Sequence, residues 1–108
     1  MKKSQNEKQN KIKVVTICGS LKFQDKMINV ARELAMNEGF CVIQPVYGID
    51  KKTALEEQII KVNKAHYKKI DISDAIFVVN ENHYIGESTK NEIAYAQKHG
   101  KEIMYLEK

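Results

Sequence analysis

Residues 12–20, with the sequence IKVVTICGS, form the most informative stretch of this 108-residue chain. Residues 12–18 are a nearly continuous β-branched run that ends at Gly19-Ser20, a pattern typical of a strand buried on both faces of a parallel sheet. The hydrophobic period then changes to three or four residues over residues 23–35, and Gly39 follows as a helix stop. The stretch therefore predicts a buried strand, a tight turn and an amphipathic helix.

The same alternation continues to the end of the chain. Residues 40–44 form a second apolar run closed by Pro45, the only proline. Thr53-Ala54-Leu55-Glu56 has the form of a capping box and predicts a second helix. The apolar face of that helix is expected to contain Leu55, Ile59, Val62, His66 and Ile70. Further predicted elements are a strand over 75–79, a helix over 88–99 and a strand over 102–106.

This order of elements predicts an α/β fold. Strands that alternate with helices and connect in the right-handed sense form a small doubly wound sheet, flavodoxin-like or Rossmann-like. We expect about four parallel strands in the order 2-1-3-4 and three helices. With 43% hydrophobic residues, the chain has room for one domain, which we place at residues 12–108.

The net charge of +4 comes from the N-terminus. Residues 1–13 hold five lysines and one glutamate, so residues 14–108 carry 13 basic and 13 acidic side chains. We expect residues 1–11 to form a disordered basic tail, because they are polar and lack hydrophobic periodicity. A balanced domain gives no indication of a nucleic acid polymer or a membrane as partner, and deletion of the tail is expected to leave catalysis unchanged.

The cysteines and the hydropathy pattern indicate a cytoplasmic protein. Cys18 and Cys41 lie in apolar runs without the spacing of a zinc site, so buried free thiols are expected, with no metal and no cofactor. No apolar run reaches the roughly 18 residues of a membrane span, and no cleavable signal pattern is present.

In the predicted strand order, ligands bind outside the carboxyl ends of strands 1 and 3. The loops there are residues 18–21 and 80–89, and they offer Gly19, Ser20 and Asn80 as candidate binding residues. Several functions are excluded. The chain lacks GxxxxGK[ST], the phosphate-binding P-loop motif, and GxGxxG, the dinucleotide-binding motif. A receiver domain would need an acidic residue at the end of strand 1 or 3 to hold Mg²⁺ and accept phosphate, and neither strand has one. A cysteine phosphatase would need an arginine six residues after Cys18, where the chain has Gln24.

The local patterns leave each remaining candidate with two interpretations. Gly19-Ser20 can bind an anion at a helix N-terminus or serve as an ordinary helix entry. Thr89-Lys90-Asn91-Glu92 is itself a capping box, in which Glu92 would only bond back to the backbone. His66 lies on an apolar helix face, where a histidine is commonly a hydrogen-bonded core residue.

Three segments together resemble the nucleoside 2-deoxyribosyltransferase family, whose superfamily includes 2′-deoxynucleoside 5′-phosphate N-hydrolases. They are ICGS at residues 17–20, SDAIFVV at 73–79, and Gly86 followed by EIAYA at 92–96. The similarity runs from about Ile12 to Leu106 and keeps the family's order of elements.

The resemblance implies that Glu92 attacks the anomeric carbon of a nucleoside. It also implies that Gly86 and Ser88 hold the sugar or a 5′-phosphate, and that Gly19-Ser20 lines the same pocket. Two positions differ from the family pattern. His66 stands where an aspartate usually moves a proton to or from the leaving base, so we hypothesise that His66 takes the acid/base role. Thr16 stands where a tyrosine is often found.

The expected substrate is a nucleoside or nucleotide, whose N-glycosidic bond is cleaved or whose deoxyribosyl group is transferred. Two alternatives stay open: a non-catalytic nucleotide-binding or sensing module of the same fold, and a phosphoribohydrolase for ribonucleoside monophosphates. A small four-stranded sheet leaves apolar surface uncovered, and the family often completes its pocket from a neighbouring subunit. We therefore expect a homodimer or a higher homo-oligomer.

Overall fold

The computed structural model describes residues 11–108, which contain four strands in one parallel sheet with the order β2-β1-β3-β4. The strands are β1 (Val14–Cys18), β2 (Cys41–Ile43), β3 (Ala75–Val78) and β4 (Glu102–Tyr105), and the helices are α2 (Gln24–Glu33), α3 (Glu56–Asp71) and α4 (Glu87–Lys98). The predicted class, strand order and three helices are confirmed. The predicted tail, except for Lys11, lies outside the described residues.

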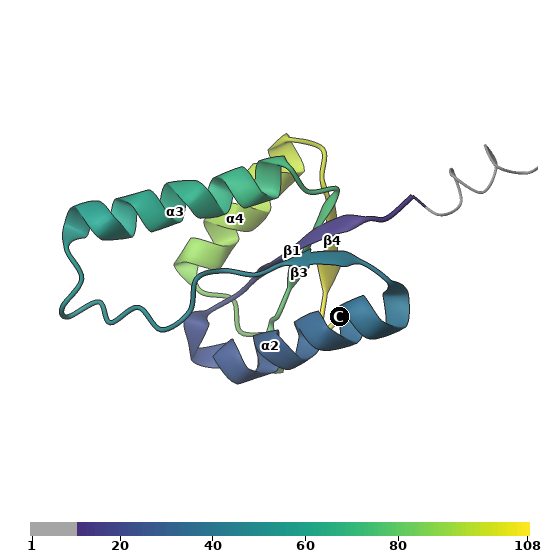
Figure 1. Ribbon diagram of the computed structural model, residues 1–108, viewed down its shortest axis with the longest axis horizontal. Coiled ribbons are helices and arrows are strands. Elements are labelled where there is room, and N and C mark those ends of the chain that lie inside the picture. Colours follow the sequence, from purple (N-terminus) through teal and green to yellow (C-terminus); the bar gives the residue numbers. More distant parts are fainter. Residues whose placement is uncertain (1–10) are drawn as a thin grey trace, which may run out of the picture.

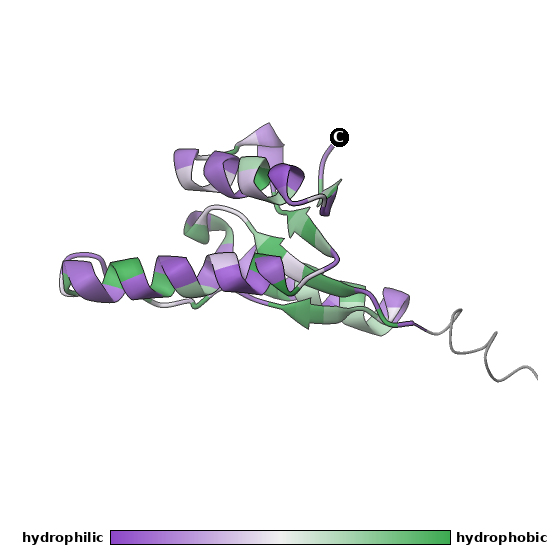
Figure 2. Cartoon of the chain, turned by 90° about the horizontal axis from the view of Figure 1, so that it is seen from above, coloured by the Kyte–Doolittle hydropathy of each residue, from purple (hydrophilic) through white to green (hydrophobic). Residues whose placement is uncertain are grey.

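The helices cover both faces of the sheet, with α2 on one face and α3 and α4 on the other (Figure 1). Alternation along β1 separates the two cores: Ile17 packs with Met27 and Val30 of α2, whereas Cys18 packs with Ile70 of α3 and Ala96 of α4. Figure 2 shows hydrophobic residues concentrated in the strands of the sheet. Residues of β1 on the α3/α4 face can therefore take part in a site beside those helices.

The segment around α2 follows its sequence pattern. A short 3₁₀ turn over Leu21–Phe23 precedes the helix, and a π-helical turn over Leu34–Glu38 follows it. The backbone then turns at Gly39, whose φ of 72° lies in the left-handed region that glycine adopts without a steric penalty. The predicted helix and its stop are confirmed.

The start of α3 differs from its prediction. Thr53 does not cap the helix; its hydroxyl donates to the carbonyl of Asp50 in the preceding turn. Leu55 is the N-cap, and its backbone N–H donates to the side chain of Gln58 at 2.9 Å. The capping-box assignment at Thr53 is therefore wrong. The helix begins two residues later, and the side chain of Gln58, three residues after Leu55, takes the place predicted for Glu56.

The two thiols also differ in their surroundings. Cys18 is buried, as expected, but Cys41 is exposed because it begins the edge strand β2. The expectation of a buried thiol is therefore wrong for Cys41. None of the helices in residues 11–108 has the length and apolar character needed to cross a bilayer.

Candidate functional site

A cavity of about 420 Å³ opens beside the carboxyl end of β1. Four segments line it: the turn after β1, the loop over residues 45–51, residues 59–66 of α3 and the beginning of α4. In a parallel sheet with this order, the carboxyl ends of β1 and β3 flank the point at which the winding reverses. The cavity thus adjoins the place where doubly wound folds bind ligands.

Helical spacing places His66 and Glu92 on the cavity wall. Ile70 of α3 and Ala96 of α4 are both fully buried against the sheet. His66 and Glu92 each lie four residues earlier on the same helix face, one turn closer to the helix N-terminus. Both side chains therefore reach the carboxyl edge of the sheet, where both line the cavity.

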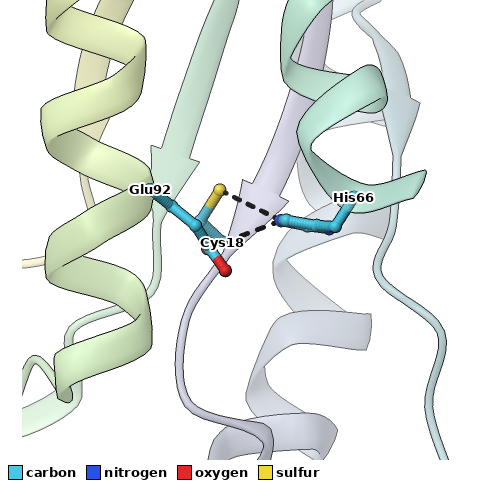
Figure 3. A group of neighbouring side chains, drawn as sticks. All are labelled: Cys18, His66 and Glu92. Carbon is cyan, nitrogen blue, oxygen red and sulfur yellow. Dashed lines mark hydrogen bonds and ion pairs between the residues drawn. The ribbon is translucent and has the colours of Figure 1, made fainter. Parts of the chain in front are cut away.

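The side chains of Cys18, His66 and Glu92 converge at this wall from β1, α3 and α4 (Figure 3). Nε2 of His66 lies 3.5 Å from Sγ of Cys18 and 3.5 Å from Oε1 of Glu92. The histidine and glutamate side chains are only 11% and 14% exposed. The imidazole and the carboxylate are thus close neighbours at a mostly buried wall of the cavity.

Glu92 belongs to the second turn of α4 and does not cap that helix. The helix begins at Glu87 with Gly86 as N-cap, and the hydroxyl of Ser88 donates to Oε2 of Glu92 at 3.4 Å. The capping-box interpretation of Glu92 is therefore wrong. Each carboxylate oxygen instead has a polar neighbour, with His66 on one side and Ser88 on the other.

Cys18 is the member of this group that sequence reasoning missed. Burial raises the pKa of its thiol well above the ordinary value, and the negative charge of Glu92 and a hydrogen bond to that carboxylate raise it further. The thiol is consequently neutral at physiological pH. The alternation of side chains along β1 puts Cys18 on the face toward α3 and α4, but β1 is buried on both faces, so no sequence signal singles out Cys18.

His66 is buried, as its apolar helix face indicates, but it is not satisfied as an ordinary core histidine. Its Nδ1 atom is buried and has no hydrogen-bond partner among the described residues. Nε2 is thus the ring nitrogen with polar neighbours, and it faces Cys18 and Glu92.

The other predicted binding residues lie on the same cavity, with one exception. Gly19, Ser20, Gly86 and Ser88 all line it. Asn80 does not: its side chain donates to the carbonyl of Glu107 and accepts from the backbone N–H of Glu107, both at 2.9 Å. The geometry gives Asn80 a structural role in holding the end of the chain against β3.

Gly19 and Thr16 also have structural reasons for their identity. A Cβ atom on Gly19 would lie 3.0 Å from the carbonyl oxygen of Val79, so the close approach of the two backbones requires glycine. The hydroxyl of Thr16 is buried and lies 2.7 Å from the hydroxyl of Ser73. Thr16 therefore bonds to the segment that leads into β3. The residue of β1 that contacts Glu92 is Cys18.

The chain matches no model of a known family and no curated protein. A carboxylate, an imidazole and a hydroxyl line a cavity large enough for a small metabolite, and a buried neutral thiol adjoins the imidazole. These groups suit nucleophilic catalysis by a carboxylate with proton transfer by histidine.

Proposed function

We propose that this protein cleaves the N-glycosidic bond of a nucleoside or nucleotide, or transfers its deoxyribosyl group, with Glu92 as the nucleophile. The observation that carries the proposal is the placement of the Glu92 carboxylate on the cavity wall between His66 and Ser88. The resemblance of residues 17–20, 73–79 and 86–96 to nucleoside 2-deoxyribosyltransferases supports the same role.

The reaction proceeds in two displacements. One carboxylate oxygen of Glu92 attacks the anomeric carbon, the carbon–nitrogen bond breaks, and the base leaves with the bonding electrons. The result is a glycosyl ester on Glu92. Water or a second base then attacks the same carbon from the opposite face and releases Glu92, so the two inversions give net retention.

His66 supplies the proton that the leaving base needs. Its Nε2 atom lies 3.5 Å from the nucleophilic carboxylate, so the imidazole and the anomeric centre would be neighbours in the bound complex. In the second step, the deprotonated ring accepts a proton from the attacking water or base. The ring is thus neutral while Glu92 is esterified, and it regains its proton as Glu92 is released.

Substrate binding uses further polar groups of the cavity lining. Ser20 and Ser88 offer hydroxyl groups to the sugar, and Lys22 and Lys51 also line the cavity. Two cations in a site of this size can attract a 5′-phosphate. A nucleoside 5′-monophosphate is thus the form of substrate that uses most of the polar groups.

The experiment that tests the proposal is incubation of the protein with a panel of deoxyribonucleosides, ribonucleosides and their 5′-monophosphates, followed by chromatography of the free base. We expect base release that disappears in Glu92→Gln and persists in Glu33→Gln. Glu33 is an exposed carboxylate of α2, the helix on the other face of the sheet. Tight binding without release in the wild type would contradict the proposal and indicate a nucleotide-binding module.

Sugar preference separates the proposed reaction from its catalytic rival. Activity that is confined to ribonucleoside monophosphates would indicate a phosphoribohydrolase. Activity on deoxyribosyl substrates, with or without a second base as acceptor, is the expected result. Addition of a free base during the reaction distinguishes transfer from hydrolysis, because only transfer produces a new nucleoside.

A further inference from the structure

His66 and Glu92 of the cavity wall, together with the buried Cys18 that adjoins them, are also a set of metal donors. Cys18 offers Sγ, His66 offers Nε2 and Glu92 offers a carboxylate oxygen, and these atoms all lie within 4.8 Å of one another. They come from three different elements, so no local spacing in the sequence reveals them (Figure 3). The absence of a ligand motif around Cys18 therefore does not decide whether the folded chain binds a metal.

The distances can be compared with those of a tetrahedral site. Zinc binds sulfur at about 2.3 Å and nitrogen or oxygen at about 2.0–2.2 Å, so neighbouring ligand atoms in a tetrahedron are roughly 3.3–3.6 Å apart. The Sγ–Nε2 separation is 3.5 Å, and the Nε2–Oε1 separation is also 3.5 Å. Two of the three separations thus match those of a tetrahedral site, and the third, between Sγ and the carboxylate oxygen, is at most 4.8 Å.

We propose that Cys18, His66 and Glu92 bind a thiophilic divalent cation of the zinc type, with its fourth coordination position open to the cavity. A thiolate and an imidazole favour Zn²⁺ over Mg²⁺ or Ca²⁺, which prefer oxygen ligands. As the sulfur–metal bond forms, the thiol proton is released to solvent. Three protein ligands with an open position are typical of accessible rather than structural zinc sites.

The surroundings of His66 indicate that this binding is reversible. A histidine that ligates through Nε2 carries its proton on Nδ1, and metal sites usually provide an acceptor for that proton. Among the described residues, Nδ1 of His66 has no such partner. Loss of an outer acceptor lowers metal affinity by about 10–100-fold, so we expect an exchangeable cation and not a permanently bound one.

The consequence for activity rests on the proposed function. A cation at this position occupies the carboxylate of Glu92 and the Nε2 lone pair of His66, which are the groups assigned to the glycosidic reaction. The metal should therefore inhibit base release and compete with substrate. Direct metal binding, in contrast, can be measured without any substrate, so the two proposals fail independently.

The experiment uses Co²⁺ as a spectroscopic probe after treatment of the full-length protein with a chelator. A thiolate bound to Co²⁺ gives a near-ultraviolet charge-transfer band. We expect this band to saturate at one equivalent in the wild type, to persist in Cys41→Ala, and to vanish in Cys18→Ala. Zn²⁺ should remove the band by displacing Co²⁺.

Variants of the other ligands complete the test. We expect Glu92→Gln and His66→Asn to lower the Co²⁺ affinity at least about tenfold, and Glu33→Gln to leave it unchanged. If Cys18→Ala does not fold, the affinities of these three variants decide the question. The absence of a band in the wild type, a band that depends on Cys41, or an affinity insensitive to both Glu92 and His66 would overturn the proposal.

Discussion

Nε2 of His66 lies 3.5 Å from Oε1 of Glu92 across the carboxyl edge of the sheet, and neither side chain is more than 14% exposed. The two residues are on different helices, and each is held by a buried residue one turn further along: Ile70 on α3 and Ala96 on α4. The pair is consequently fixed by the packing of both helices on the sheet. In the proposed reaction, this relationship allows His66 to protonate the leaving base while Glu92 attacks the anomeric carbon.

Replacement of His66 should affect substrates according to their leaving groups. His66→Ala removes the proton donor, and we expect it to slow release of a natural base about 100-fold or more. A nitrophenyl deoxyriboside should be much less affected, because nitrophenolate leaves without a proton. The measurement is the rate of product release for both substrates. Equal losses for the two substrates would show that His66 only maintains the structure of the site.

The buried thiol should make stability depend on alkaline pH. The pKa of Cys18 is raised in the folded protein, first by burial and then by Glu92. Above the ordinary thiol pKa of 9.0, the unfolded chain therefore loses this proton while the folded chain keeps it. The unfolded state binds fewer protons, so the free energy of unfolding falls as pH rises, by at most about 1.4 kcal/mol per pH unit for one proton.

Urea unfolding at a series of pH values from 8 upward checks this dependence. We expect a smaller decrease in Cys18→Ser than in the wild type, and an unchanged decrease in Cys41→Ser, whose thiol is exposed. An equally steep loss of stability with pH in Cys18→Ser and the wild type would show that the Cys18 thiol does not cause the dependence.

Asn80 should matter for stability and not for substrate binding. Asn80→Ala removes two hydrogen bonds to the backbone of Glu107, and we expect a loss of about 1–3 kcal/mol in the free energy of unfolding. The KM for substrate should stay the same, because Asn80 does not line the cavity. Asn37→Ala, at an exposed position, is the matched control for urea unfolding. A raised KM in a fully stable Asn80→Ala protein would refute this role.

Self-association is expected beside the cavity. Val46, Leu55 and Ile60 are 46%, 56% and 47% exposed, and they come from the loop and the part of α3 that contribute to the cavity wall. We expect sedimentation equilibrium to show a dimer or a larger assembly at micromolar concentration, and Ile60→Glu to shift it toward monomer. A wild type that sediments as a monomer would argue against a pocket shared between subunits.

The fold could be predicted from the sequence because each strand and each helix has a distinct hydrophobic periodicity. The β-branched run before Gly19 and the three- and four-residue spacing after it fix a strand and a helix locally. The helix start predicted at Thr53 is wrong, because the N-cap backbone N–H of Leu55 donates to Gln58 and not to Glu56. Cys41 shows a related limit: an apolar run does not reveal that its strand lies at the edge of the sheet.

The residues of the site could be predicted from the sequence only in part. Glu92, Ser88 and Gly86 follow one another on the chain, so a short motif contains them. The meeting of Cys18 with His66 and Glu92 depends on how three separate elements pack, and no local pattern encodes it. Asn80 shows a second limit of local patterns: it follows a strand at the expected edge, but its side chain is bound to the backbone of Glu107.

The central claim is that Glu92 forms a covalent bond to the sugar. The most direct test is mass spectrometry of the protein quenched with acid during turnover of the best substrate from the panel, followed by proteolysis. We expect the peptide that contains Glu92 to gain the mass of the glycosyl group, and to lose that mass when water or an acceptor base completes the reaction. Base release during turnover with Glu92 unmodified, or with equal rates in Glu92→Gln, would contradict the account.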